Sequence, residues 1–200
     1  MEKIGLDGGQ SFRPLSIGSD AGVTPGPPVG VISMTIDLID AKTSPRDSDW
    51  IKQVLPQYLT DLAVFDPDYF RLAARYRKAP DSLDSWLSQI HVHPLVIAAD
   101  QQRAGFALIV QAPFPGVSRG VDYRMGEFFI QPKYRRRGIG RRAAWAIFNR
   151  FPGVWEVTEL PKNEPAIAFW RSAIGEYTGG DFHDAPAGDV QRQSFRTAGA

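Results

Sequence analysis

Hydrophobic and polar positions along the chain follow two spacings, one typical of strands and one typical of helices. Apolar and β-branched residues run together at 31–39, and two apolar blocks at 94–99 and 104–111 are joined by the polar residues 100–103. The first run predicts a strand. The two blocks predict an antiparallel hairpin, because so short a polar link joins neighbouring strands.

Helical spacing appears between these strands and after them. From residue 44 to residue 62, apolar residues recur at the spacing of an amphipathic helix, which Ser44 or Asp47 can cap. Its apolar stripe consists of Trp50, Ile51, Val54, Leu55, Tyr58, Leu59 and Leu62. Further helices are predicted at 69–77, 83–90, 138–150 and 163–173, further strands at 123–130 and 154–160, and a terminal hairpin within 177–195. This order of elements predicts a mixed α/β (α+β) sheet.

Composition sets the number of domains. The chain has 200 residues, of which 43% are hydrophobic, and this suits one compact domain. Residues 1–30 are rich in Gly, Pro, Ser and Asp and cannot bury enough apolar surface to order themselves. We therefore expect a flexible leader over 1–30 and a single domain over 31–200.

Charge and residue usage exclude several classes of function. The formal net charge is +1, so nothing global draws the protein to nucleic acid or to a membrane surface. There is no cysteine, and His91 and His93 point the same way from a predicted strand without a third ligand in view, so no metal site is expected. The start lacks a secretory pattern and no apolar segment is long enough to span a bilayer. The expectation is a soluble cytoplasmic protein.

The segment 131–142 carries the most distinctive chemistry. It joins the predicted strand ending at Ile130 to the helix starting near Gly138, and it holds five arginines. Gly138 and Gly140 let the backbone approach a ligand closely, and the free N–H groups of a first helical turn attract anions. Guanidinium groups suit the several phosphates of a nucleotide-like cofactor. The segment therefore predicts a phosphate-binding loop.

Two other interpretations of this loop compete. Arginines at a helix start can form a solvated basic face, although they oppose the positive end of the helix dipole. Gly138, Gly140 and Ala143 also fit the dinucleotide pattern G-x-G-x-x-G/A, with Glu159 placed as the ribose-binding acid. Against that pattern, residues 131–137 separate the strand from the first glycine, and only one more helix follows. The nucleotide-hydrolase loop G-x-x-x-x-G-K-[ST] is absent from the sequence.

The stretch from Ile130 to Gly140, IQPKYRRRGIG, resembles the acetyl-CoA motif of the GNAT acetyltransferases, [Q/R]-x-x-G-x-[G/A] after a strand and a Pro-x-Tyr turn. Downstream, the stretch from Asn163 to Trp170, NEPAIAFW, is similar to the Asn-x-x-Ala-x-x-Phe-Tyr helix of that family. The resemblance is strong over 123–173, and within the family the chain looks most like a group of small bacterial predicted acetyltransferases. It implies a mostly antiparallel central sheet flanked by helices, with a splayed strand pair at the cofactor cleft.

The resemblance also implies which residues bind acetyl-CoA. The end of the strand before the loop would offer backbone groups to the pantetheine and the acetyl carbonyl, and the loop would hold the diphosphate. Asn163 and the aromatic residue at the end of the second motif would face the cofactor. The implied residues are Phe128, Phe129, Ile130, Arg135, Arg136, Arg137, Gly138, Ile139, Gly140, Arg141, Asn163 and Trp170.

Acetyl transfer to an amine needs a base for the amine proton and a donor for the leaving thiolate. Carboxylates on the predicted splayed strands are the candidate bases: Glu127 first, then Glu159 and Glu156. Trp170 occupies the usual tyrosine position of the family, and its indole N–H is too weak an acid to protonate a thiolate. Tyr177 or Tyr134 could replace it as the proton donor, although Tyr134 is better explained as a packing residue. Water is another candidate donor, and departure of the thiolate without protonation is the third alternative.

The implied activity is acetyl transfer to a primary amine of a small molecule or peptide. A module that senses acetyl-CoA without turnover is the alternative, and a nucleic-acid contact through the arginines is disfavoured by the nearly neutral total charge. Six aromatic residues lie in the helices where such enzymes recognise acceptors, although ordinary core packing explains each of them: Trp50, Tyr58, Tyr69, Phe70, Tyr76 and Trp86. The sequence names neither the acceptor nor the oligomeric state, and a homodimer is left open.

Overall fold

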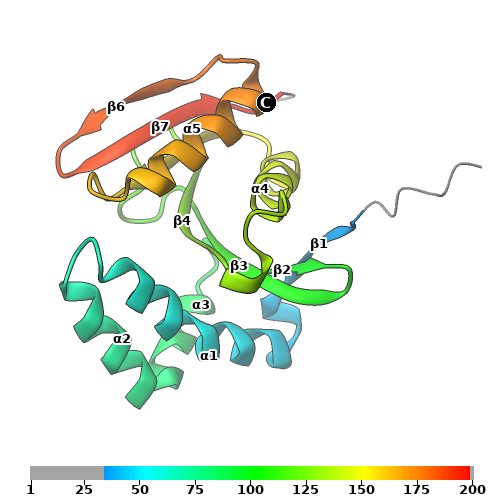
Figure 1. Ribbon diagram of the computed structural model, residues 1–200, viewed down its shortest axis with the longest axis vertical. Coiled ribbons are helices and arrows are strands. Elements are labelled where there is room, and N and C mark those ends of the chain that lie inside the picture. The colour runs from blue at the N-terminus through cyan, green and yellow to red at the C-terminus, as the bar shows by residue number, and fades with distance from the viewer. Residues whose placement is uncertain (1–33, 199–200) are drawn as a thin grey trace, which may run out of the picture. The chain divides into compact units, whose positions relative to one another are not determined.

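The computed structural model describes residues 34–198, which form one α/β unit (Figure 1). The predicted leader, 1–30, and the beginning of the first predicted strand lie outside the described residues. In chain order the strands are β1 (Ile36–Asp40), β2 (Val92–Ala99), β3 (Gln102–Gln111), β4 (Tyr123–Ile130), β5 (Val154–Glu159), β6 (His183–Ala187) and β7 (Val190–Arg196). The helices are α1 (Pro45–Leu62), α2 (Asp68–Lys78), α3 (Asp84–Leu87), α4 (Ile139–Arg150) and α5 (Glu164–Thr178).

All seven strands join in one sheet with the order β1-β2-β3-β4-β5-β7-β6. Every neighbouring pair is antiparallel except β4 and β5, which are parallel and are connected through α4. The predicted mixed, mostly antiparallel sheet is therefore confirmed. A doubly wound dinucleotide-binding sheet is excluded, because that fold needs a run of parallel strands.

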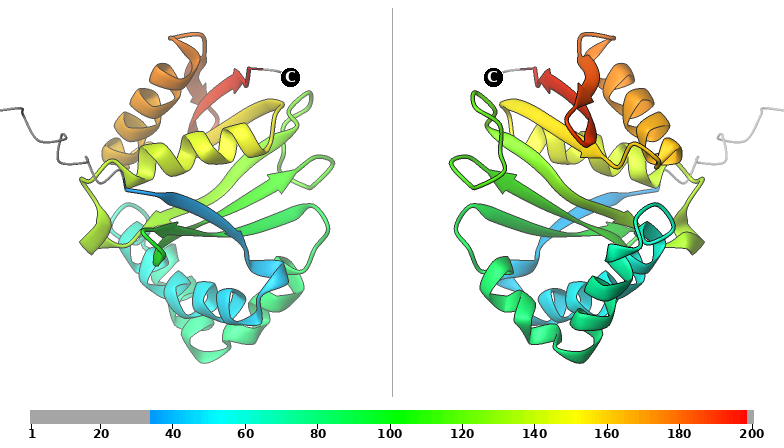
Figure 2. Two further views of the ribbon diagram at one scale, coloured as in Figure 1. Left: turned by 90° about the vertical axis from the view of Figure 1, so that its right-hand side faces the viewer. Right: turned by 90° about the vertical axis from the view of Figure 1, so that its left-hand side faces the viewer.

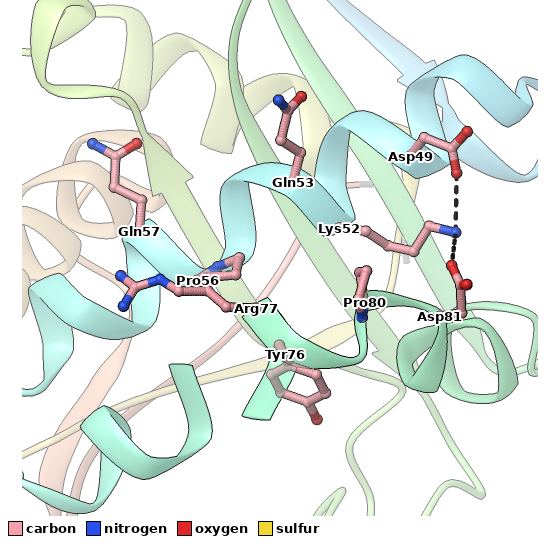
Figure 3. Close-up of a pocket in the computed structure, with 9 residues that line it drawn as sticks. All are labelled: Asp49, Lys52, Gln53, Pro56, Gln57, Tyr76, Arg77, Pro80 and Asp81. Atoms are coloured by element: carbon pink, nitrogen blue, oxygen red, sulfur yellow. Dashed lines mark hydrogen bonds and ion pairs between the residues drawn. The ribbon is translucent and has the colours of Figure 1, made fainter. Parts of the chain in front are cut away.

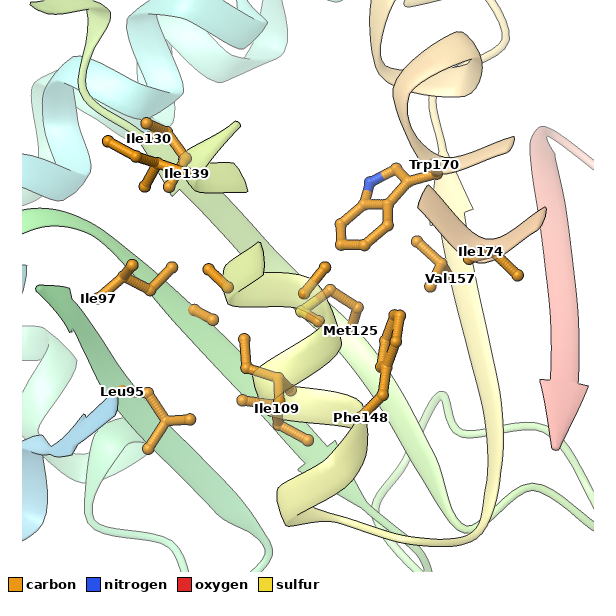
Figure 4. Close-up of a cluster of buried hydrophobic side chains, with 14 of the residues drawn as sticks. Leu95, Ile97, Ile109, Met125, Ile130, Ile139, Phe148, Val157, Trp170 and Ile174 are labelled. Atoms are coloured by element: carbon orange, nitrogen blue, oxygen red, sulfur yellow. The ribbon is translucent and has the colours of Figure 1, made fainter. Parts of the chain in front are cut away.

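Helices cover the sheet on two sides, α4 and α5 on one and α1 to α3 on the other (Figure 2). The larger apolar cluster lies under α4 and α5, where side chains of both helices meet those of β2 to β5, among them Phe148, Trp170 and Met125 (Figure 4). The second cluster lies between α1 to α3 and strands β2 to β4, around Phe106 and Leu59.

Most predicted elements appear near their predicted places, and Ser44 caps α1 by accepting the N–H of Asp47. The hairpin of β2 and β3 turns in two residues, Asp100 and Gln101, which have φ angles of 47° and 63°. The terminal hairpin forms from β6 and β7.

Three predicted boundaries are wrong. β1 begins only at Ile36, because its partner β2 ends at the paired residue Ala99. The third helix is a 3-10 turn, Pro80–Leu83, followed by the single turn α3, because the chain must already enter β2 at Val92. α5 continues through Gly175 to Thr178 and ends at the left-handed Gly179, and Tyr177 is therefore helical.

Candidate functional site

The parallel strands β4 and β5 separate partway along their length. Their pairing ends at Met125 and Val157, although β4 continues to Ile130 and β5 to Glu159. The predicted splayed strand pair is thus present. Beyond Met125, the edge of β4 that faces β5 has no strand partner in the described part of the chain, so its backbone groups are available to a ligand.

A β-bulge at the start of this opening changes the direction of the β4 side chains. Leu108 of β3 pairs with Glu127 and Ile109 pairs with Met125, which leaves Gly126 as the extra residue. A Cβ atom on Gly126 would lie 3.0 Å from the Leu108 carbonyl oxygen, so a larger residue would crowd the bulge. Because of the bulge, Met125 faces α4 and α5 while Glu127 faces α1.

The start of α4 presents a run of unpaired backbone N–H groups. Within residues 34–198, no protein group accepts the N–H of residues 136 to 141, and intrahelical bonding begins with Arg142, whose N–H donates to the Gly138 carbonyl at 3.1 Å. Arg136 and Gly138 have φ angles of 63° and 72°. Left-handed residues within such a turn curve the backbone so that successive N–H groups converge on one point, which is the geometry of an anion-binding nest.

The five arginines of the loop divide into two groups. Arg135 donates to the Ile130 carbonyl and pairs with Asp61 of α1, Arg141 pairs with Glu176, and Arg142 donates to the Met34 carbonyl. Arg136 and Arg137 are exposed and form no hydrogen bond or ion pair among the described residues. These two side chains are the ones left to meet an anion at the start of α4.

Gly140 has a packing role beside the nest. A Cβ atom at this position would lie 3.3 Å from the Phe169 ring of α5, so glycine lets the first turn of α4 approach α5. Phe169 in turn stacks on Phe128 of β4, with ring centroids 5.9 Å apart. Asn163 caps α5 by accepting the N–H of Ala166 at 3.2 Å. The strand end, the nest and the start of α5 therefore meet around one opening.

Glu127, on the part of β4 beyond its pairing with β5, has a raised pKa. The Tyr58 hydroxyl of α1 donates to its Oε2 at 2.6 Å. Burial raises the pKa of Glu127 to about 7, while the Tyr58 hydrogen bond and the charge of Arg124 oppose the rise. Tyr58 itself is held by contacts of its ring with Phe106 and Phe129. A carboxylate with a pKa of about 7 divides between its acid and base forms at neutral pH, which suits proton transfer.

Of the other two candidate bases, Glu159 is turned away from this position, while Glu156 is on the same face of the sheet as Glu127 but is bound by the loop before β4. Glu159 is on the side of β5 that faces α5, beside Arg171 and Asp184, and neither of its carboxyl oxygens has a hydrogen-bond partner in residues 34–198. Burial raises its pKa to about 8, the charge of Asp184 adds to the rise, and Arg171 opposes it. Glu156 faces the other side of the sheet, where its Oε1 accepts the N–H of Ser118 at 3.0 Å.

The raised pKa of Glu159 predicts a stability effect. A folded-state pKa above the ordinary value of 4.5 means that the folded protein holds this proton more tightly than the unfolded chain, so stability falls as pH rises from about 4.5 to 8. Glu159→Gln cannot ionise and should raise the free energy of unfolding by about 1–3 kcal/mol above pH 8. The gain should vanish near pH 4, as followed by urea unfolding.

The exposed Glu164→Gln serves as the control, since it should show no such pH-dependent gain. A Glu159→Gln protein that is less stable than the parent at pH 8 would contradict this prediction. It would show that the carboxylate makes favourable contacts in the folded protein and that its burial does not destabilise the fold.

The candidate proton donors are not beside Glu127. Tyr177 lies near the far end of α5, where its hydroxyl donates to Asn149 Oδ1 at 2.8 Å. It is 14 positions after Asn163, which places it roughly 20 Å along the helix axis from the opening. Trp170 is only 5% exposed and packs edge-on against Phe128, with its nitrogen on the ring edge away from Met125 and Phe148 (Figure 4). Tyr134 packs against the larger apolar cluster.

A hollow on the other side of α1 lies apart from the opening. It has a volume of about 490 Å³ and lies between α1 and α2, where Lys52 pairs with Asp49 and Asp81 (Figure 3). Lys52 also pairs with Asp84. Because the three carboxylates form ion pairs with the lysine, the hollow contains a structural ion-pair cluster.

Among the residues described, no group of acidic or histidine side chains is arranged to hold a metal, and His93 contacts Gln111 at 3.0 Å. No helix of that part is long and apolar enough to cross a membrane.

Sequence reasoning missed the partners that place Glu127. Tyr58 and Glu127 are 69 positions apart, and the helical spacing of Tyr58 predicts only that it packs on the sheet. Arg135 was expected at the phosphate, yet its guanidinium ties the end of β4 to α1. No local pattern distinguishes Arg135 from the two arginines that follow it.

Residues 57–175, more than half of the chain, match the family model described as the acetyltransferase (GNAT) family. No curated protein sequence matches the chain.

Solved structures share the fold at low sequence identity. An acetyltransferase from Thermus thermophilus is 16% identical with a TM-score of 0.56, over 81% of this chain and 97% of that one. The PaiA N-acetyltransferase of Thermoplasma acidophilum, in complex with coenzyme A, is 12% identical with a TM-score of 0.53, over 82% and 99%. YncA of Salmonella typhimurium, with its cofactor acetyl-CoA, is 14% identical with a TM-score of 0.52, over 84% and 95%.

Proposed function

This chain belongs to the GNAT acetyltransferase family, and we propose that it transfers the acetyl group of acetyl-CoA to a primary amine of a small molecule or peptide while both are bound. The observation that carries the proposal is the run of unaccepted N–H groups at residues 136 to 141, beside a strand pair that has opened. Two relatives of the same fold were solved with coenzyme A or acetyl-CoA. A diphosphate is the doubly charged anion that such a nest accommodates.

The nest, the two strands and α5 would each hold one part of acetyl-CoA. Arg136 and Arg137 add charge around the diphosphate, and backbone groups of β4 after Gly126 would bind the pantetheine and orient the acetyl carbonyl. The side-chain amide N–H₂ of Asn163 makes no hydrogen bond in the described part of the chain and would donate to the pantetheine arm. Because both reactants are fixed, positioning supplies much of the rate acceleration.

Glu127 would act as the general base. An ammonium group has no lone pair, so Glu127, directly or through a water molecule, removes a proton from the acceptor before the amine nitrogen bonds to the acetyl carbon. The C–S bond then breaks and the sulfur leaves with the bonding electrons. With Trp170 in the tyrosine position and Tyr177 at the far end of α5, we propose that solvent protonates the thiolate.

Tyr58 should tune the pH dependence of the reaction. Its hydroxyl stabilises the charged form of Glu127, so Tyr58→Phe should raise the pKa of Glu127 and move the acidic limb of the kcat/KM profile to higher pH. A hydrogen bond to a charged group is worth about 1.5 kcal/mol, which corresponds to about one pH unit. Rates across pH 5–9 measure the shift.

Tyr76→Phe is the matched control, since Tyr76 also packs on the second apolar cluster but its hydroxyl makes no hydrogen bond within the described residues. If both variants keep the parental limb, Glu127 is not the group that titrates in the reaction.

A screen of amine classes with acetyl-CoA, followed by release of the coenzyme A thiol, tests the proposed function. Turnover with at least one class supports it. Tight binding of acetyl-CoA without transfer to any amine would instead favour a sensing module.

A further inference from the structure

Within residues 34–198, no helix covers one face of the C-terminal half of the sheet. Along β5 and β7, Trp155, Val157, Gln193 and Phe195 are buried toward α5, so the alternate residues point to the opposite face. Helices α1 to α3 cover that opposite face over β1 to β4, and their apolar cluster contains no residue of β5, β6 or β7 among those described. Figure 1 shows these helices below the β2–β4 part of the sheet, with α5 alongside β7.

Two arginines converge on this open face next to the opening between β4 and β5. Arg124 of β4 donates through Nη2 to the Thr158 Oγ1 at 2.7 Å and through Nη1 to the Gly116 carbonyl. Arg192 of β7 is the direct cross-strand partner of Thr158 and donates weakly to the Ser118 Oγ at 3.4 Å. Both guanidinium groups therefore lie over β5, one from each side.

Neither guanidinium group has a carboxylate partner within residues 34–198. Every oxygen that they contact is neutral. The nearest acid by register is Glu156, which is only 1% exposed, lies beyond ion-pair distance of both, and has Oε2 without a partner. Two fixed positive charges thus share a half-exposed surface with the buried Glu156 and with Glu127 farther along β4, and neither carboxylate forms an ion pair with either guanidinium group.

The same face contains the proposed base. Glu127 and Arg124 are three positions apart on β4, roughly 7–10 Å along the strand, and Arg124 is close enough to lower the pKa of Glu127. A molecule with its amine at Glu127 would therefore place a group a few bonds away beside Arg124. An arginine pair of this kind matches the planar, two-oxygen geometry of a carboxylate.

We infer that the acceptor is a small amine that also carries a carboxylate, with the amine at Glu127 and the carboxylate between Arg124 and Arg192. This inference rests on the proposed acetyl transfer and narrows its acceptor to amino-acid-like molecules. The two positive charges would also disfavour the ammonium form of the acceptor and so help to present a neutral nucleophile.

The test compares matched acceptors that differ only at the carboxylate. Amino acids, their carboxamides and their decarboxylated amines are assayed with saturating acetyl-CoA. The parent protein should prefer the carboxylate member by about 10- to 100-fold in kcat/KM, mostly through KM, the range expected for hydrogen bonds to a charged group. A phosphate-bearing amine is included, and preference for it over the carboxylate would overturn the assignment.

Variants then locate the preference. Arg192→Gln changes a residue away from Glu127 and should reduce the ratio of carboxylate to carboxamide activity by at least about tenfold. Arg124→Lys keeps the positive charge but loses the two-donor geometry of the guanidinium group, so it should reduce this ratio less. Arg46→Gln, an exposed arginine of α1, should leave the ratio unchanged.

The outcomes separate the two levels of the proposal. Turnover of amines without any preference for the carboxylate overturns this inference and leaves acetyl transfer standing. An unchanged ratio in Arg192→Gln, with the parental melting temperature and acetyl-CoA affinity, shows that the arginines only fasten the loop at 112–122 to the sheet. If the parent acetylates nothing, the proposed function fails and this inference fails with it.

Discussion

Glu127→Gln should lower kcat by about 10²- to 10⁴-fold, the contribution typical of a positioned general base. Glutamine has nearly the same shape and can still accept the Tyr58 hydroxyl, so the loss would come from chemistry rather than from packing. Acetyl-CoA affinity should stay within about twofold, since Glu127 faces α1 and not the start of α4. Pre-steady-state acetyl transfer and calorimetric binding measure the two quantities separately.

The rate deficit should narrow at high pH, where the acceptor amine is already neutral and no longer needs the base. Glu164→Gln is the control for loss of a carboxylate and should retain parental kcat. A Glu127→Gln enzyme with parental kcat at pH 7 would remove Glu127 from the mechanism.

Gly138→Glu should weaken binding of acetyl-CoA by at least about 100-fold. The substitution sets a carboxylate against the diphosphate, and two like charges about 5 Å apart repel by roughly 3 kcal/mol at an effective dielectric constant of 20. It also forces a side chain into a left-handed conformation, since Gly138 has a φ of 72°. Titration calorimetry gives the dissociation constants.

Gly138→Ala separates charge from backbone strain. A Cβ atom here meets nothing within 4 Å, so alanine should cost some stability but change acetyl-CoA affinity by less than about fivefold. Equal weakening in both variants would mean that the loop conformation, and not the charge of the bound group, controls affinity.

The fold was largely predictable because its elements have strong local signals. The two apolar blocks around Asp100 specify a hairpin, and the glycines at 138 and 140 mark the start of α4. Boundaries were less predictable where a tertiary partner sets them. β1 begins where β2 offers no further pairing residue, and α3 is short because β2 follows at once.

The site was predictable only where its residues are adjacent in sequence. The loop from Gln131 to Arg142 indicates an anion site, and the structure gives it unaccepted N–H groups. The change in side-chain direction that points Glu127 toward α1 depends on the β-bulge at Gly126. This bulge is set by the pairing of β4 with β3. Contacts between distant segments, such as Tyr58 with Glu127 and Arg135 with Asp61, leave no periodic trace in the sequence.

A crystal structure of the protein with coenzyme A bound tests the central claim most directly. The account predicts diphosphate oxygens within about 3.2 Å of several backbone nitrogens among residues 136 to 141, with the pantetheine passing between β4 and β5. Coenzyme A bound elsewhere, such as in the hollow around Lys52, with the start of α4 left without an anion, would contradict it.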